Sequence, residues 1–336
     1  MAQGQLWTTN SLGGFFYAQQ LSDELRMDLL PMEQFRQFCD ARDASAQGKG
    51  HGQIFTWDQV GTLARANRAL TETNTMPESQ FRILQGTGTV VERGVAVPYT
   101  GMLEALSKFS VRQPIMKALK VDANRDLDAL AFNQFNNTPL RYANSTATTG
   151  PATAFTTNGT ATLTNSQAFA TYDAKAIVDI MRERNIPFYT ENNYVAIGWP
   201  TTFRAVKNTL ETLREYTETG MQMILNGEIG RYEQTRYVEQ TNVPKGGAAD
   251  SATFDALNNT ADAWNGAYSD WIFFIGDDAV IEGTAIPVEV RAKIPGDYGR
   301  SKGVAWYSLL GYACVHSATA ATDPANWPVV KWDSAV

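Results

Sequence analysis

The chain has 336 residues, of which 43% are hydrophobic and 19% charged, so it can bury a sizeable core and global disorder is excluded. Its net charge of -7 argues against a protein that grips nucleic acid through phosphate contacts. Two cysteines and two histidines nearly exclude a disulfide framework or a structural zinc site, and no apolar run reaches the roughly 18 residues of a membrane span. The start, MAQGQLWTTN, has no signal-peptide pattern, so we expect a soluble protein made in a reducing cytoplasm.

Residues 1–50 form the least core-like stretch. They mix Gln, Ala and Gly with scattered apolar residues, and an amphipathic helix is expected near Leu21–Phe38, interrupted by Pro31. The stretch ends in the flexible sequence AQGKGHG. This composition predicts an arm that packs on something else, so that deleting residues 1–50 should leave a folded subunit.

Residues 52–98 begin and end with a strand, Gln53–Val60 and Val90–Val97. The residues between are polar, and the eight charges of the whole segment are balanced, four acidic and four basic. A two-stranded ribbon of this length is marginal in water on its own, so it should lie on a neighbour. Balanced charges suit a subunit that must meet copies of itself.

The longest helix is expected over Pro114–Asn137, about 36 Å at 1.5 Å per residue. Ser110 is a candidate cap, and Pro114 lies near the first turn, where its missing N–H costs nothing. One apolar face is formed by Ile115, Leu119, Leu127, Leu130 and Phe135. The following residues, 142–168, are rich in Thr, Ala, Asn and Gly and predict a surface loop or a low-complexity connector.

From residue 171 the pattern becomes α/β-like. A helix is expected at Asp173–Arg184, and another opens at Pro200 and carries an apolar stripe from Phe203 to Leu213. A Gly/Asn/Ala-rich insertion covers 244–267. The expected strands are Tyr194–Trp199, Arg236–Val243, Trp271–Ile275, Ala285–Val290 and Val304–Val315. The last is so apolar that we expect it to be buried on both faces.

The few histidines and cysteines give little support to catalysis. His51 lies in a flexible turn and His316 follows a buried strand, so neither fits the base of a catalytic triad well. Cys314 and His316 would share one strand face, where a metal or thiolate role is conceivable but an interior pair is the better interpretation. Gly86-Thr87-Gly88 lacks the third glycine of a dinucleotide-binding motif.

Two acidic pairs and the tryptophans are candidates for parts of a sugar or metal site. Asp126 and Asp128 fall on a helix face expected to be solvated, and Asp277 and Asp278 on a turn. Most tryptophans fall inside apolar strands, as core residues do. The sequence therefore predicts an α+β protein with no catalytic, cofactor-binding or metal residues, and with no cofactor.

Two runs of the sequence resemble a known family. They are ENNYVAIGWP, Glu191–Pro200, and NGEIGRYEQTRYVE, Asn226–Glu239. They are similar to the Y-V-A-x-x-x-P turn and the N-G-E-I-G-x-x-x-x-x-R-[FY]-V-E run of tailed-phage major capsid proteins, particularly the family typified by the short-tailed phage N-four. The strands around Ile54–Trp57 and Gly303–Tyr307 occur in matching order, so the resemblance covers nearly the whole chain.

The resemblance implies the Hong Kong 97 phage capsid fold. In that fold residues 1–50 would be the N-terminal arm, 51–99 the extended E-loop, 100–142 the peripheral domain with its spine helix, and 143–299 the axial domain. Residues 300–336 would return to the peripheral domain.

The function that the resemblance implies is structural and not enzymatic. Copies would assemble into pentamers and hexamers of an icosahedral shell around a double-stranded DNA genome. Expected partners are the chain itself, a portal protein at one vertex, scaffolding and decoration proteins, and packaged DNA through non-specific contact only, with no membrane. The protein would reside in the virion after assembly in the bacterial cytoplasm. An encapsulin-like cargo shell is the alternative, and a carbohydrate-active or carbohydrate-binding protein is a more distant one.

Overall fold

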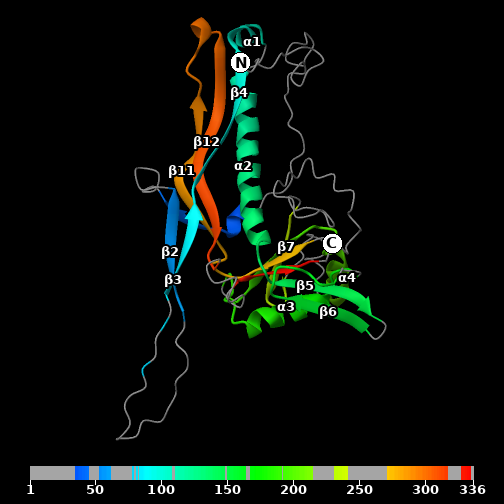
Figure 1. Ribbon diagram of the computed structural model, residues 1–336. Coiled ribbons are helices and arrows are strands. Elements are labelled where there is room, and N and C mark those ends of the chain that lie inside the picture. Colours follow the sequence, from blue (N-terminus) through cyan, green and yellow to red (C-terminus); the bar gives the residue numbers. More distant parts are fainter. Residues whose placement is uncertain are drawn as a thin grey trace.

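A single helix of 25 residues, α2 (Arg112–Asn136), runs past one sheet and ends at another. Figure 1 shows it beside the long strands of one lobe, with its last turns above the sheet of the second lobe. The helix begins at Arg112, two residues before the expected start. Its N-cap residue is therefore Val111 and not Ser110, and no side chain caps the first turn. Pro114 falls in the first turn, where N–H groups have no partner within the helix.

The computed structural model describes most of the chain, and all statements about the fold concern this part. The described residues are 35–44, 53–61, 78, 81, 83–107, 110–147, 150–163, 167–190, 192–214, 231–240, 271–316 and 327–333. His51, the insertion 244–267 and most of the helix expected at Leu21–Phe38 lie outside these residues.

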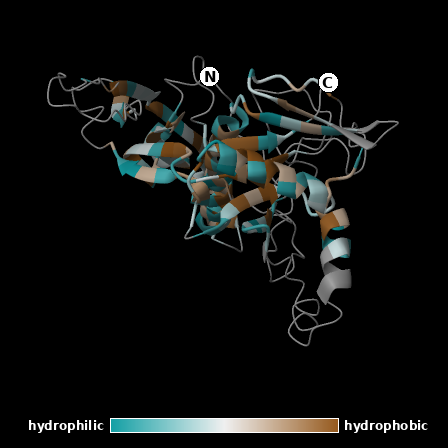
Figure 2. Cartoon of the chain, turned by 90° about the horizontal axis from the view of Figure 1, so that it is seen from below, coloured by the Kyte–Doolittle hydropathy of each residue, from teal (hydrophilic) through white to brown (hydrophobic). Residues whose placement is uncertain are grey.

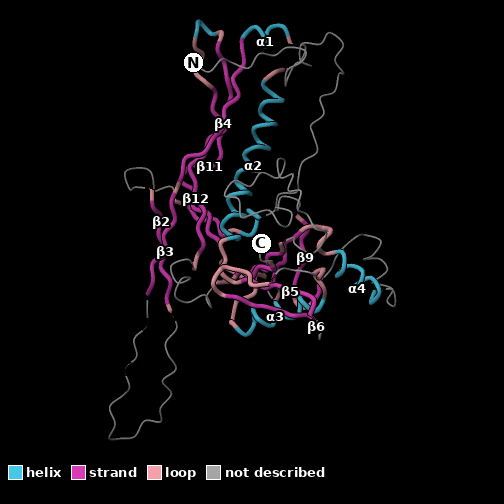
Figure 3. The backbone as a smooth tube through the Cα atoms, turned by 45° about the vertical axis from the view of Figure 1, so that its right-hand side comes forward, coloured by secondary structure: helices cyan, strands magenta, loops and turns pink. Residues whose placement is uncertain are grey.

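The first lobe contains a four-stranded sheet that lies along α2 (Figure 3). Its order is β1 (Asp40–Asp43), β11 (Val280–Ala292), β12 (Ser301–Cys314) and β4 (Val91–Thr100). The central strand β12 is antiparallel to β11 and β4 and contributes Val304 and Trp306 to a core with α2. From Val304 to Leu310 buried and half-buried residues alternate along β12. The expectation that both faces of this strand are fully buried is therefore wrong there, because α2 covers one face only.

A two-stranded ribbon packs on the lower end of this sheet. It consists of β2 (Ile54–Val60) and β3 (Ile83–Thr89). The rings of Phe55 and Trp57 lie where a Cβ on Gly88 or Gly86, their partners across the ribbon, would be, and the Trp57 indole donates to the carbonyl of Val315 at 2.8 Å. The G-T-G sequence therefore provides room for aromatic rings.

The second lobe is a seven-stranded sheet with two helices. Its order is β6 (Gly150–Thr156), β5 (Arg141–Ala147), β13 (Val329–Trp332), β10 (Ile272–Ile275), β7 (Tyr194–Gly198), β9 (Thr235–Glu239) and β8 (Arg231–Tyr232), with helices α3 (Thr171–Glu183) and α4 (Arg204–Arg214). Its central strands β10, β7 and β13 are buried along their whole length. Figure 2 shows hydrophobic residues concentrated at the centre of the molecule.

Part of the segment 142–168 forms a hairpin, so the prediction of a surface loop is wrong there. Strands β5 and β6 pair in antiparallel register, with Tyr142 opposite Phe155. Threonine and aromatic residues favour strands, but they do so through contacts across the sheet. Those contacts are not visible in the composition of the segment alone.

The pairing of strands also crosses the expected domain boundaries. Strand β11 falls within 143–299 but belongs to the four-stranded sheet, and β13 falls within 300–336 but lies between β5 and β10 in the seven-stranded sheet. Sheet membership depends on partners distant in sequence, whereas the expected boundaries followed the order of the chain. The chain therefore passes from one lobe to the other several times.

The beginning of the described chain belongs to the core of its own subunit. A 3₁₀ turn (Phe35–Phe38) leads into β1, which pairs in parallel with β11. Phe35 is fully buried, and its ring centroid lies 5.3 Å from that of Phe132 and 5.7 Å from that of Phe273. The expectation that all of 1–50 packs elsewhere is therefore wrong for 35–44, and deleting 1–50 would remove part of the core.

We expect Phe35→Ala to lower the free energy of unfolding by about 3–5 kcal/mol, because it leaves a cavity among buried aromatic rings. Phe81→Ala is the matched control, since Phe81 is 55% exposed and its loss should change stability little. Chemical denaturation of the unassembled subunit measures both. Equal effects of the two substitutions would contradict the placement of Phe35.

Candidate assembly surfaces

The histidine and cysteine candidates do not form a reactive pair. Cys314 is buried and its thiol lies 3.1 Å from the carbonyl of Gln134, and burial raises its pKa to about 12. His316 is half-buried beyond the end of β12; burial lowers its pKa, and the nearby Asp278 carboxylate opposes that shift. Among the described residues no group of three His, Cys, Asp or Glu side chains could hold a metal ion.

Of the two acidic pairs, one is placed as expected and the other is not. Asp277 and Asp278 are exposed in a turn, where Asp278 has a left-handed backbone, φ 53°. Asp128 is only 2% exposed, so the prediction of a solvated helix face is wrong at this position. Asp126 is half-buried and pairs with Arg93 of β4 at 3.3 Å.

Asp128 belongs to a polar cluster between the two lobes, which we call the lobe junction: Arg36, Asp128, Gln240 and Glu282. The Asp128 carboxylate accepts from the backbone N–H of Arg36 at 3.1 Å and from the Gln240 amide at 3.0 Å. The Arg36 guanidinium donates two hydrogen bonds to Glu282, at 3.0 and 2.7 Å, and this carboxylate raises the pKa of Arg36. The junction joins the start of the described chain, α2, β11 and the residue after β9.

A second buried network closes the C-terminal end of α2. Lys331 is fully buried; its Nζ lies 2.6 Å from Asn136 Oδ1 and 3.5 Å from the ring centroid of Trp271. Arg141 donates to the Asn136 carbonyl at 2.9 Å and to Asp333 at 2.7 Å. Cations are stabilised at the negative, C-terminal end of a helix. Because Lys331 belongs to β13 and Asn136 to α2, the network also holds this strand against the end of the helix. A lysine within the apolar run VVKW was the only signal for it in the sequence.

Large apolar side chains stand exposed on the outer face of the ribbon. Ile54, Val60 and Ile83 are each more than half exposed, and Val60 lies directly opposite Ile83 in the register. Their strand neighbours Phe55 and Trp57 point the other way, into the subunit. The ribbon is therefore apolar on both faces at these positions, with only one face covered by its own chain.

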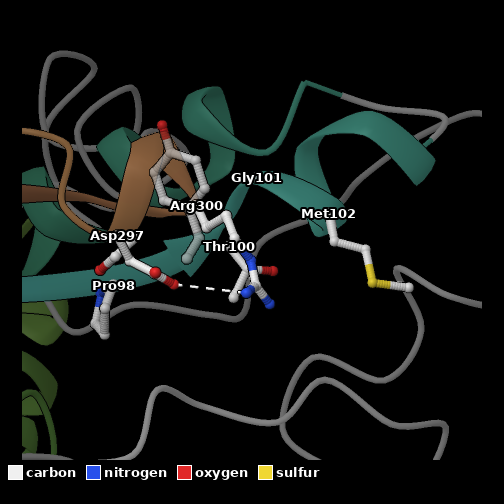
Figure 4. Close-up of a pocket in the computed structure, with 8 residues that line it drawn as sticks. Pro98, Thr100, Gly101, Met102, Asp297 and Arg300 are labelled. Carbon is white, nitrogen blue, oxygen red and sulfur yellow. Dashed lines mark ion pairs between the residues drawn. The ribbon is translucent and has the colours of Figure 1, made fainter.

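A second exposed apolar region lies at the far end of the four-stranded sheet. We call it the tip: the turn 293–300 between β11 and β12 together with the short helix α1 (Gly101–Leu106). The exposed large side chains are Met102, Leu106, Ile294 and Tyr298. A cavity of about 260 Å³ lies between the turn and α1. Figure 4 shows the Asp297–Arg300 ion pair, 3.7 Å, at its wall, and Met102 of α1 as another of the lining residues.

Solved structures of phage capsids share this fold across the whole chain. The capsid of cyanophage P-SCSP1u matches with a TM-score of 0.65 at 14% identity, covering 99% of this chain and 97% of that one. The head structure of Helicobacter pylori bacteriophage KHP40 matches with a TM-score of 0.64 at 12% identity, covering 98% of each chain. The capsid of cyanophage Pam1 gives 0.62 at 13% identity and covers 100% of both chains.

No protein-family model and no curated protein sequence matches the chain. In the part of the chain that the structure describes, no helix is long and apolar enough to cross a membrane. The mixed sheets and long helix, matched over the whole chain, define the class: the chain has the Hong Kong 97 phage capsid fold that its sequence predicts. The nearer resemblance to the family of phage N-four is not confirmed and stays a prediction.

We expect Asp333→Ala to lower the free energy of unfolding by roughly 3–5 kcal/mol, because two buried cations, Arg141 and Lys331, lose a shared carboxylate. Glu289→Ala is the control: its pair with Arg291 is half exposed and should contribute less than about 1 kcal/mol. Urea denaturation of the subunit compares them. A loss at Asp333 as small as that at Glu289 would contradict the network.

His316 should make the subunit acid-sensitive. Its pKa in the folded state lies below the ordinary value of 6.5, so as the pH falls through 6.5 the unfolded chain takes up the proton first. Stability is therefore lost between pH 6.5 and the folded pKa, and His316→Gln should flatten this part of the profile. Thermal melting across this pH range measures it, with His51→Gln as the control for the other histidine. An unchanged slope in His316→Gln would exclude this residue as the source.

Proposed function

We propose that this chain is the major capsid protein of a tailed phage, and that its copies form the icosahedral shell enclosing a double-stranded DNA genome. The observation that supports this most is the correspondence in fold over 97–100% of the capsid proteins of P-SCSP1u, KHP40 and Pam1. A shell subunit acts by binding its neighbours, which fits a role without catalysis.

The exposed apolar surfaces support the same proposal. A subunit that worked alone would leave Ile54, Val60 and Ile83 in water on the ribbon, and Tyr298 at the tip. Exposed clusters of this kind mark contact surfaces. In a shell each subunit meets several neighbours, so separate contact surfaces at the ribbon and the tip are expected.

The parts of the fold can be assigned on this proposal. The ribbon β2–β3 would be the E-loop, α2 the spine helix, the four-stranded sheet the body of the peripheral domain, and the seven-stranded sheet with α3 and α4 the axial domain. Copies would form pentamers and hexamers, with a portal protein at one vertex and scaffolding and decoration proteins as further partners. Assembly would occur in the bacterial cytoplasm, and the mature protein would reside in the virion.

The net charge of -7 fits a wall that faces packaged DNA without binding it. A strongly basic wall would hold the phosphates and oppose the release of the genome. Contact with DNA would therefore be non-specific and weak.

The decisive experiment is electron microscopy of the purified full-length protein together with light scattering for mass. We expect closed polyhedral shells or capsomer-sized rings. A 37.0 kDa monomer at all concentrations, both alone and after co-expression with the phage's own head genes, would contradict the proposal. Shells that enclose a protein cargo in their native host and never DNA would favour the encapsulin-like alternative.

A further inference from the structure

The turn at the tip has an unusual backbone. Asp297, Tyr298 and Gly299 are three consecutive residues with positive φ, at 51°, 52° and 89°. Only glycine adopts this region without strain, so the two side-chain-bearing residues are held there by their surroundings. Strained residues of this kind cluster where a protein must present a side chain in one position.

The surroundings do hold the turn firmly. The backbone N–H groups of Ser301 and Gly299 both donate to the Gly296 carbonyl, and the N–H of Gly101 donates to the Arg300 carbonyl at 2.9 Å. Lys302 pairs with Glu104 of α1 at 2.6 Å. The turn and α1 are therefore one rigid unit.

The Tyr298 side chain does not pack against its own chain, although the backbone that carries it is held firmly. Its side chain is fully exposed, and Ile294 beside it is 88% exposed. The cavity of about 260 Å³ next to the turn is lined by other residues of the tip: Pro98, Tyr99, Thr100, Gly101, Met102, Asp297, Arg300 and Ser301. The same tip therefore carries an aromatic side chain in solvent and an open cavity that this side chain does not enter.

We propose that Tyr298 of one copy inserts into the tip cavity of a neighbouring copy. This inference rests on the proposed shell function and names the residues of one subunit contact. The cavity suits a phenol: Pro98 and Met102 provide apolar surface, the Arg300 guanidinium can stack on the ring, and the hydroxyl groups of Thr100 and Ser301 can bond the phenol oxygen. Because the inserted side chain differs from the cavity that receives it, the contact can run head-to-tail, and it closes into a ring of tips if the rotation between copies closes.

The charges at the tip complement those of a second tip. The tip carries partly or largely exposed side chains of both signs: Arg300 and Lys302 with Asp297 and Glu104. Arg300 and Asp297 are paired in the subunit, but their side chains remain 82% and 61% exposed, so each can also meet an opposite charge of the neighbour. A surface with exposed charges of both signs can pair its cations with the anions of a second copy.

The first test replaces the inserted side chain. Tyr298→Ser should reduce the yield of closed particles at least tenfold at equal protein concentration, while the melting temperature of the unassembled subunit stays unchanged because the side chain contacts nothing there. Tyr298→Phe, the matched control, keeps the ring and should assemble within twofold of the parent. Particles formed by Tyr298→Ser at the parental yield would overturn the inference.

The second test locates the contact directly. A minority of subunits carrying Tyr298→Cys is mixed with an excess of subunits carrying Met102→Cys, which keep the tyrosine and so allow assembly. The particles are then oxidised, and we expect a disulfide-linked dimer on non-reducing gels. The parent protein and a mixture of Tyr298→Cys with Tyr172→Cys are the controls; Tyr172 is 53% exposed on α3 in the other lobe. Burial raises the thiol pKa of both native cysteines, Cys39 and Cys314, so they should not form background crosslinks.

The two tests separate this inference from the proposed function. If particles form from the Tyr298→Cys and Met102→Cys mixture but contain no more dimer than the controls, the tip contact is wrong and the shell function stands. If the parent itself never forms particles under any assembly condition, the shell function fails, and the tip contact fails with it.

Discussion

The structure depends on α2 serving two cores at once. The first half of the helix packs Ile115, Leu119 and Ala123 against the four-stranded sheet, and its last turns place Phe132 and Phe135 in the core of the seven-stranded sheet. A 25-residue helix is about 37 Å long, and its ends are fixed relative to each other. The position of one lobe therefore sets the position of the other.

The two buried polar networks follow from this arrangement. The lobe junction lies around Asp128, near the change from one core to the other, and the Lys331 network lies where α2 ends. Apolar contacts alone tolerate sliding, whereas hydrogen bonds to buried charges have one satisfactory geometry. Buried polar groups of this kind can specify a single arrangement. On the proposed shell function, every copy needs the same angle between its lobes, and these networks fit that need.

The sequence predicted the elements that depend on local pattern and missed those that depend on distant partners. Periodicity located α2, α3 and β7 to within a few residues, and the order of two short runs indicated the fold through resemblance. The hairpin β5–β6 was missed because a composition rich in Thr, Ala, Asn and Gly is also typical of loops, and only the pairing of the two strands shows that it is a hairpin. Asp128 looked solvated because its partners, Arg36 and Gln240, are 92 and 112 residues away. At the tip, nothing in the sequence marks a left-handed Tyr298.

The division between buried and exposed groups also bears on how such a subunit assembles. Its own stability rests on continuous cores and buried ion networks. The exposed large apolar side chains of the described residues are instead spread over several places, among them the ribbon, the tip and strands β4 and β11. Contacts made through several weak sites add up over a closed shell, yet each can open while an incorrectly placed subunit is exchanged. The strained turn at the tip fits this balance: backbone strain of about 1–3 kcal/mol at each such residue is tolerated where it positions a side chain. A larger continuous apolar surface would keep incorrectly placed subunits bound, and it would also make the free subunit prone to aggregation.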